Sequence, residues 1–347
     1  MFNKIYAGLK NFIKENWVFL SIFIIFLVVN FVRLPYEVEM PGGTIDLGNR
    51  ITVDGKKPDI KGSFNMAYVE VSQGSVLYVL AGLIIPDWEV LKVSDLIYEN
   101  ETLEDSNLRD KIYLEQSKNA ATLAALNASG TKYTISKINN SVVYVDKEAE
   151  TDIKIGDDII ECDGETVENL EKVVEIVKTK KAGDVIKLKV LRDEKKVDVT
   201  AKVYDTEDGP KIGLMSLTTY DIDSEKKVKI DSKTSESGPS GGLMMSLMIY
   251  NALTDQDLTN GKKVVGTGTI DEAGNVGEIG GVKFKIMGAV KDKADVFLVP
   301  AENYDEAMEV KKKKKYDIEI VRVETLQDAI DYLEGKWLWR NIIVKIL

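Results

Sequence analysis

Apolar and polar positions change their spacing several times along the chain, and the longest apolar run lies near its start. From Trp17 to Val32 the sequence WVFLSIFIIFLVVNFV is interrupted only by Ser21 and Asn30. A helix needs roughly 20 mostly apolar residues to cross the hydrocarbon of a bilayer. The run approaches that length and has no polar face, which disfavours a buried core helix. It therefore predicts a transmembrane anchor.

The charges on either side of this run predict its orientation. Lys4, Lys10 and Lys14 precede it, whereas Glu37 and Glu39 follow it. By the positive-inside rule, the N-terminus is expected in the cytoplasm and the rest of the chain outside the cell membrane, as a single-pass protein. A cleaved signal peptide is the competing interpretation, but no small-residue cleavage site follows the run.

Shorter patterns predict the first elements after the anchor. The apolar stretch from Val76 to Ile85 has ten residues before Pro86, a length that suits buried structure better than a second span. We expect a turn at Pro41–Gly43 and strands around 50–53 and 67–71. Helical spacing from Leu108 to Leu126 predicts a helix that ends near Gly130.

Between residues 132 and 204 the pattern changes to short strands around one helix, which we expect at 170–177. The segment IGDDIIECDG at 155–164 lies between two of these strands, and GDVIKLKV follows the helix at 183–190. This order resembles a PDZ domain of the bacterial protease-associated type. The resemblance implies capture of an extended peptide by strand addition, without indicating which residues form the groove. A small β domain without a ligand is the alternative.

The composition excludes several kinds of chemistry. The chain has no histidine and one cysteine, Cys162, so it has no Ser-His-Asp triad, no Cys-His dyad and no internal disulfide. Cys162 ends an apolar run and is expected to be a buried strand residue. A net charge of −11 argues against nucleic-acid binding, and the lysines at 311–315 are expected to form a solvated face. Acid-base catalysis then depends on Lys, Asp, Glu or Tyr.

Ser240 lies in the segment SGPSGG at 237–242, directly before the apolar run from Leu243 to Tyr250. If that run is a buried helix, Ser240 lies where backbone N–H groups are unpaired and able to stabilise an oxyanion. Serine is also a favoured helix N-cap, so the segment alone does not distinguish a nucleophile from a cap.

A serine nucleophile without histidine needs another base, and a lysine kept neutral by burial can serve. Holding a lysine amine neutral near pH 7 costs about 4 kcal/mol in water, since its ordinary pKa is about 10.4. Lys283 and Lys285, in GGVKFK at 280–285, both lie at the edge of the apolar stripe of a predicted helix. Helical spacing does not choose between them.

Four motifs in this order resemble the proteolytic domain of the Lon peptidase family: GPSGG with Ser240, GTGTI at 266–270, the glycine-rich segment 274–285, and the strand VFLVP at 296–300. The resemblance implies Ser240 as nucleophile, Lys285 as general base, and Thr267 as the residue whose hydroxyl orients the lysine amine. Gly238 and Ser237 are implied supporting residues. Ser237 stands where many Lon enzymes have an acidic residue.

No G-x-x-x-x-G-K-[ST] motif and no G-x-G-x-x-G motif occur, so we expect no ATP and no dinucleotide site, and neither a cofactor nor a metal. The chain thus resembles the membrane-anchored, ATP-independent Lon-like proteases of Gram-positive-type cell surfaces. This implies an α+β fold and a serine endopeptidase that cleaves peptides or exposed segments of surface proteins. The alternatives are a catalytically silent adaptor and a chaperone-like peptide-binding protein.

The expected domain boundaries combine these observations. Residues 1–35 form the cytoplasmic N-terminus and anchor, 36–128 the first part of the protease domain, 129–205 the inserted PDZ-like domain, and 206–335 the core of the protease. The tail at 336–347, with Trp337 and Trp339 among basic residues, is expected either at the membrane interface or packed on the protease.

Overall fold

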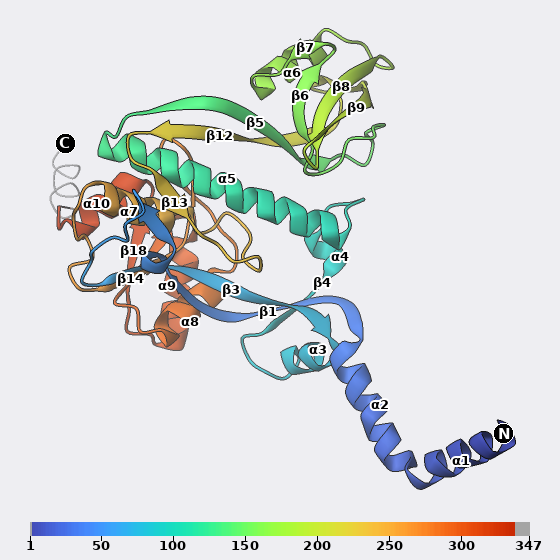
Figure 1. Cartoon of the computed structure of the whole chain (residues 1–347). Helices are drawn as coiled ribbons and strands as arrows, with labels where there is room; N and C mark the ends of the chain where they lie inside the picture. The colour runs from blue at the N-terminus through green and yellow to red at the C-terminus, as the bar shows by residue number, and fades with distance from the viewer. Residues whose placement is uncertain (1, 337–347) are drawn as a thin grey trace. The chain divides into compact units, whose positions relative to one another are not determined.

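A computed structural model describes residues 2–336 of the chain (Figure 1), and the predicted roles of the tail beyond Lys336 therefore lie outside the described residues. The structure is a mixture of α-helices and β-strands, as predicted. It divides into two compact units. The first contains Met1–Pro41 and Val69–Ile97, and the second contains Gly42–Tyr68 and everything from Tyr98 onward.

Two helices begin the first unit, α1 (Phe2–Glu15) and α2 (Trp17–Phe31). Helix α2 matches the predicted apolar run, and none of its residues is buried. With 15 residues it is about 22 Å long at 1.5 Å per residue, shorter than a bilayer's hydrocarbon core. Among the described residues no single helix meets the length and hydropathy expected of a membrane span. The two helices together do, but they meet at an angle of 80°.

The rest of the first unit is a small β-layer with a short helix on it. Strand β4 (Glu89–Lys92) pairs antiparallel with the start of β1 (Arg33–Asp46), with Tyr36 opposite Lys92. Helix α3 (Val76–Gly82) precedes β4, and α4 (Val93–Leu96) follows it.

The prediction that residues 76–85 are buried is wrong. Leu83 is 73% exposed and Ile84 is 80% exposed. The reason is that only the Gly82 side of α3 lies against this β-layer, at Val38 and Val90. A two-stranded layer covers one side of a short helix and leaves the other side uncovered.

A central sheet organises the second unit. Its strand order is β18 (Glu319–Val323), β17 (Val296–Pro300), β14 (Lys263–Gly266), β3 (Ser63–Ser75) and β1. Strand β14 is parallel to both β17 and β3, so residues before the small domain join the same sheet as residues far beyond it. Parallel neighbours require crossover connections, which here carry the site's helices.

Helices cover both faces of this sheet. Helices α5 (Leu103–Ser129), α7 (Gly242–Leu253) and α10 (Leu326–Leu333) share a hydrophobic core with Val264 and Leu298 on one face. Helix α8 (Val282–Lys291) and residues of α9 (Tyr304–Lys314) share a second core with Val265 and Phe297 on the other. Successive strand residues point to opposite faces, which explains this alternation.

The predicted turn at Pro41–Gly43 is wrong, because these residues lie within strand β1. A Cβ atom at Gly42 would lie 2.4 Å from the carbonyl oxygen of Tyr68, and one at Gly288 of α8 would lie 3.1 Å from the amide nitrogen of Gly43. Glycine in a strand commonly marks such a close approach of two backbones. Gly42 therefore allows the close approach of Tyr68 on β3, and Gly288 allows α8 to pack directly on β1.

A smaller domain is inserted between α5 and α7. Its sheet has the order β12 (Leu214–Ser224), β5 (Tyr133–Val145), β6 (Asp158–Cys162), β8 (Val185–Arg192) and β9 (Lys195–Lys202), and it includes helix α6 (Leu170–Lys178). Its core includes the buried Cys162, as predicted, and Ile212. The small domain thus extends past the expected boundary at residue 205 into β12.

The remaining elements are short. They are the 3-10 helices η1 (Leu47–Asn49) and η2 (Ala301–Asn303), and the strands β2 (Ile51–Val53), β7 (Glu165–Thr166), β10 (Tyr204–Thr206), β11 (Gly209–Lys211), β13 (Val228–Ile230), β15 (Thr269–Ile270) and β16 (Val276–Gly277).

Candidate active site

Ser240 directly precedes the buried helix α7. The N-cap of α7 is Gly241, and no side chain caps this helix. Ser240 therefore does not occupy the N-cap position, contrary to the N-cap interpretation of the GPSGG segment. Most residues of α7 are buried, whereas Ser240 is partly exposed. Its side chain is thus accessible at the start of a helix that is itself fixed in the core.

The carbonyl group of Ser240 accepts two hydrogen bonds from the loop after β14. The Gly268 amide donates at 2.8 Å and the Thr267 hydroxyl at 3.0 Å. Thr267 is fully buried. In the structure this hydroxyl donates to the nucleophile's own backbone, and the role in orienting the lysine amine that the resemblance implied stays a prediction.

The preceding carbonyl, that of Pro239, is held from the other side. The hydroxyl of Ser117 on α5 donates to it at 2.9 Å, and the Gly242 amide donates at 3.2 Å. In a trans peptide the N–H points away from the C=O, so the Ser240 N–H faces away from Ser117. Within residues 2–336 neither the Ser240 N–H nor the Gly241 N–H has a hydrogen-bond acceptor. Both are available to an oxyanion.

Gly238 and Ser237 lie just upstream of the nucleophile. Gly238 has φ of +83°, a conformation that favours glycine, and its N–H donates to the Asp110 carbonyl of α5 at 2.9 Å. Ser237 is exposed. The carboxylate next to it, Glu236, is paired with Arg50 at 2.9 Å. The Glu236 carboxylate is therefore already engaged in an ion pair with Arg50.

The two candidate lysines on α8 differ in burial. Lys285 is 4% exposed, whereas Lys283 is partly exposed and its Nζ lies 5.0 Å from the centroid of the Phe284 ring. Helical spacing could not separate them, but the tertiary packing does. Burial disfavours the charged ammonium form, and of the two lysines only Lys285 is buried.

A buried asparagine fixes the chain ahead of α8. The side chain of Asn303, in η2 after β17, accepts a hydrogen bond from the Ile279 N–H at 2.9 Å and donates to the Ile279 carbonyl at 3.0 Å. The loops after β14 and β17 thus hold the segments before Lys285 and around Ser240. In open α/β sheets, sites commonly lie outside the carboxyl ends of the strands.

Sequence reasoning missed three residues that position this site, namely Ser117, Asp110 and Asn303. Ser117 and Asp110 lie on a helix that was predicted, but only the fold brings them to the nucleophile loop. Burial raises the pKa of the Asp110 carboxyl, and the neighbouring Arg109 partly opposes this. Within the described chain no group of three or more histidine, cysteine or carboxylate side chains is arranged to hold a metal ion.

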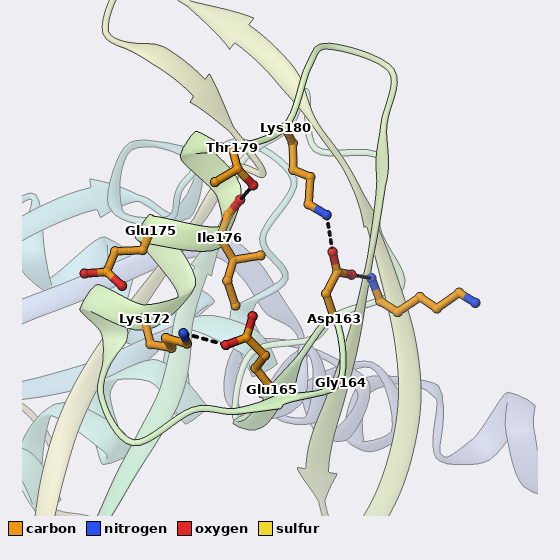
Figure 2. A pocket seen from close by; sticks show the side chains of 9 residues that line it. Asp163, Gly164, Glu165, Lys172, Glu175, Ile176, Thr179 and Lys180 are labelled. Carbon is orange, nitrogen blue, oxygen red and sulfur yellow. Dashed lines mark hydrogen bonds and ion pairs between the residues drawn. The ribbon is translucent and has the colours of Figure 1, made fainter.

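The small domain contains two hollows, and the first is charged. Figure 2 shows it beside α6, where Lys180 pairs with Asp163 at 2.5 Å and Lys172 pairs with Glu165 at 2.6 Å. The lysine and acidic side chains drawn there largely neutralise one another. None of the predicted site residues lies in it.

The second hollow is an apolar groove of about 500 Å³ between α6 and the strands β10 to β12. Val173, Val174 and Val177 line one side, and Leu214 and Met215 line the other. Strand β12 is at the edge of its sheet. An edge strand that faces a groove is the arrangement used for strand addition by a peptide.

Gly213 shapes one end of this groove. Its φ is +70°, and a Cβ atom there would lie 2.7 Å from the Tyr204 hydroxyl. The resemblance did not indicate which residues form the groove, and in the structure α6 and the strands from β10 to β12 line it.

The segments that contain Ser240 and Lys285 lie within the range that matches a known family of proteolytic domains. The profile of the Lon protease (S16) C-terminal proteolytic domain matches residues 153–334, which is more than half of the chain. The chain therefore belongs to this family.

Several Lon proteases are similar to the chain. That of Campylobacter jejuni subsp. jejuni is 25% identical over 308 residues, covering 77% of this chain and 37% of the relative. That of Campylobacter concisus is 30% identical over 162 residues, covering 44% and 20%. The chain thus matches less than two fifths of the length of either relative.

Solved structures similar to the chain include PDZ domains. The PDZ domain of the SdrC-like protein from Listeria innocua is 24% identical, with a TM-score of 0.21, and the match covers 22% of this chain and 92% of that one. The corresponding domain from Listeria monocytogenes is 23% identical, with a TM-score of 0.22, covering 25% and 93%.

Proposed function

We propose that this protein is a membrane-attached endopeptidase that works without ATP, with Ser240 as nucleophile and Lys285 as general base. The single observation that carries the proposal is the burial of Lys285, because a chain without histidine needs a base that is neutral before it can accept a proton. Ser240 is partly exposed, and among the described residues the N–H groups of Ser240 and Gly241 have no hydrogen-bond acceptor. Both observations support the same catalytic role.

In the proposed reaction, the Lys285 amine takes the hydroxyl proton of Ser240 as the serine oxygen attacks the carbonyl carbon of the scissile peptide. The amides of Ser240 and Gly241 stabilise the resulting oxyanion. When the intermediate collapses, the C–N bond breaks and the Lys285 ammonium returns the proton to the leaving amine. This leaves an acyl-enzyme ester on Ser240. Lys285 then accepts a proton from water as the water oxygen attacks the ester carbonyl. When the ester C–O bond breaks, the Lys285 ammonium returns this proton to the Ser240 oxygen and the acid is released.

Attachment to a membrane is supported by helix α2. Its side chains are apolar and largely exposed in the described structure. With the lysines of α1 on its N-terminal side, the positive-inside rule orients the catalytic unit outward. Substrates in this proposal are peptides and exposed segments of surface or secreted proteins.

The groove between α6 and β12 is the proposed second site for substrate. An extended apolar segment of the substrate adds to the edge of β12, and its side chains fill the pockets lined by valines of α6. Main-chain hydrogen bonds would supply affinity for many sequences, and the apolar lining would set the preference.

Replacing the two proposed catalytic residues one at a time tests the reaction. Ser240→Ala and Lys285→Ala should each reduce cleavage of a test peptide to background while the protein stays folded. Lys283→Ala is the matched control and should keep most of the activity, because Lys283 is partly exposed. Mass spectrometry of the incubated peptides reports new termini.

A catalytically silent adaptor is the alternative function, and it predicts peptide binding without new termini in the wild-type protein. Full cleavage by the Ser240→Ala variant would instead show that another residue is the nucleophile.

A further inference from the structure

An apolar patch on the first unit has no role in the proposed reaction. It consists of the outward side chains of α3 and the residues after it, and we call it the outer apolar patch: Leu77, Leu80, Leu83, Ile84 and Ile85. Their exposed fractions are 48%, 51%, 73%, 80% and 41%. Single exposed apolar residues are ordinary, but a contiguous group marks an interaction surface.

The patch contains no charged residue. From Val76 to Pro86 the sequence has no Asp, Glu, Lys or Arg, so nothing within it favours water or an ionic partner. Gly82 faces inward, against Val38 and Val90, and Val76, Val79 and Ala81 are partly covered. The outward side chains therefore remain uncovered because the unit has no further layer to cover them.

The outer apolar patch is continuous with helix α2. Helix α3 packs against α2 within the same unit, as Figure 1 also shows. At the C-terminal end of α2, Val29 and Asn30 are partly covered, whereas the preceding residues from Ser21 to Val28 are exposed. The patch thus lies beside the end of α2 from which the rest of the chain continues.

An aromatic pair lies at the same place. The rings of Tyr78 and Trp88 are stacked with their centroids 6.0 Å apart. Tyrosine and tryptophan are enriched at membrane–water interfaces, because one end of each side chain is apolar and the other is polar. The pair therefore fits the boundary between lipid and water.

The length of α2 gives a reason for the patch to reach the lipid. At about 22 Å, α2 is shorter than the hydrocarbon core of about 30 Å. A short apolar helix is accommodated when the bilayer thins or when flanking residues enter the interface. Helix α3 is the flanking element at this end.

We propose that the outer apolar patch inserts into the surface of the same membrane that holds α2, as a second attachment point. This inference rests on the membrane attachment proposed above. Because Asp87 and Glu89 follow the patch in sequence and Glu39 lies opposite Glu89 in the ladder between β1 and β4, attraction to anionic lipid is not its driving force. The partner is the apolar boundary of a zwitterionic bilayer.

An environment-sensitive fluorophore at position 83 tests the proposal. The full chain with Leu83→Cys is labelled with a nitrobenzoxadiazole reagent and reconstituted into phosphatidylcholine vesicles. The native Cys162 does not compete for the label, since it is buried and burial raises the pKa of its thiol to about 11. Phe23→Cys in α2 and Lys195→Cys in the small domain are the matched controls.

The measurement is quenching of the label's fluorescence, by iodide in the water and by nitroxides at two depths in the lipid. The label at position 83 should be at least about threefold less sensitive to iodide than the label at position 195, because an interfacial helix buries its apolar face by about 5–10 Å. The headgroup-proximal nitroxide should quench it best, whereas the deep nitroxide should quench the label at position 23.

Two results would overturn this inference while leaving the membrane attachment intact. One is equal iodide quenching at positions 83 and 195 together with a shielded label at position 23. The other is shielding at position 83 that increases with the protein-to-lipid ratio, which would assign the patch to contact between copies of the chain. An iodide-accessible label at position 23 would instead refute the membrane attachment itself.

Discussion

At the scale of single residues, the two carbonyl groups on either side of the Ser240 amide carry most of the site's geometry. Ser117 holds the Pro239 carbonyl, and Thr267 with Gly268 holds the Ser240 carbonyl. Two adjacent peptide planes are thereby fixed before any substrate binds. Such preorganised amides are what stabilises an oxyanion in a peptidase.

The role of Ser117 predicts a kinetic effect. In Ser117→Ala, the Pro239 peptide loses the hydroxyl that orients it, so the Ser240 N–H is less well placed. We expect kcat to fall about 10- to 100-fold with little change in KM, since misplaced oxyanion donors cost on this order. Steady-state kinetics on a peptide substrate provide the measurement.

Ser246→Ala is the matched control for this prediction. Ser246 is fully buried on α7, and its hydroxyl donates to the Leu243 carbonyl of its own helix at 2.8 Å. It should therefore change neither kcat nor KM. A Ser117→Ala variant that is as active as Ser246→Ala would contradict the positioning role.

The environment of Cys162 leads to a second prediction, on how the stability of the protein depends on pH. Burial raises the pKa of its thiol to about 11 from an ordinary value of 9.0. The folded state holds the proton more tightly than the unfolded state, so this group favours folding below about pH 9 and loses that contribution as the pH rises to about 11. The stability difference between wild type and Cys162→Ala should therefore narrow between pH 7 and pH 10, as urea unfolding measures.

Alkylation provides an independent check on the same thiol. At pH 8 the thiolate fraction should be about a hundredfold lower than that of an ordinary cysteine, so iodoacetamide should react only when the small domain opens. Reaction of the native protein at the rate of a free cysteine would contradict this assignment.

At the scale of elements, the position of α8 depends on glycines as well as on side-chain packing. A Cβ atom at Gly288 would lie 3.1–3.2 Å from backbone atoms of Gly42 and Gly43. Gly288→Ala should therefore push α8 away from β1, costing about 1–3 kcal/mol of stability. Because Lys285 lies one turn earlier on α8, kcat should fall as well.

Gly8→Ala provides the comparison, because nothing lies within 4 Å of a Cβ atom at this helical glycine. It should leave kcat unchanged. If Gly288→Ala lowered stability without lowering kcat, the placement of α8 would not set the position of the base.

Elements were predictable from sequence where one pattern dominated locally. Helices α6 and α7 lie where the pattern of apolar residues placed them, and strand β17 lies where the family resemblance implied a strand. The apolar stretch at 76–85 was not predictable, because length and composition do not reveal that only one side of α3 has a neighbour.

The residues of the candidate site also differ in how far their own stretch of sequence predicted them. Ser240 could be placed at the start of a helix from its own neighbourhood. The choice between Lys283 and Lys285 could not be made, since both lie at the edge of the apolar stripe and the contacts that bury Lys285 come from elsewhere in the chain. Ser117 and Asn303 carried no local signal, because their partners are distant in sequence.

At the scale of the whole molecule, the proposed peptide groove and the nucleophile lie on different domains, so their effects on a substrate can be separated. Val174 lines the groove and is 48% exposed. Val174→Glu should weaken cleavage of long substrates at least about tenfold through KM, since even an unpaired neutral polar group in an apolar pocket costs roughly 1–3 kcal/mol and a charge costs more. A short peptide that reaches only Ser240 should be cleaved at the wild-type rate.

Val185→Glu is the control for this comparison, because Val185 is also exposed on the small domain but does not line the groove. Both kinds of substrate should be cleaved normally by it. Equal loss on short and long substrates in Val174→Glu would argue against a separate recruiting site.

The ladder between β5 and β12 has a further consequence. Tyr133, where the chain enters the small domain, is the pairing partner of Ser224, where the chain leaves it. An insertion whose two ends are neighbours can be removed or exchanged without displacing the elements on either side. The small domain can therefore be exchanged as a unit. A domain that senses light, a metal or a drug could be inserted between these two strands, and the peptidase would need no newly designed linker.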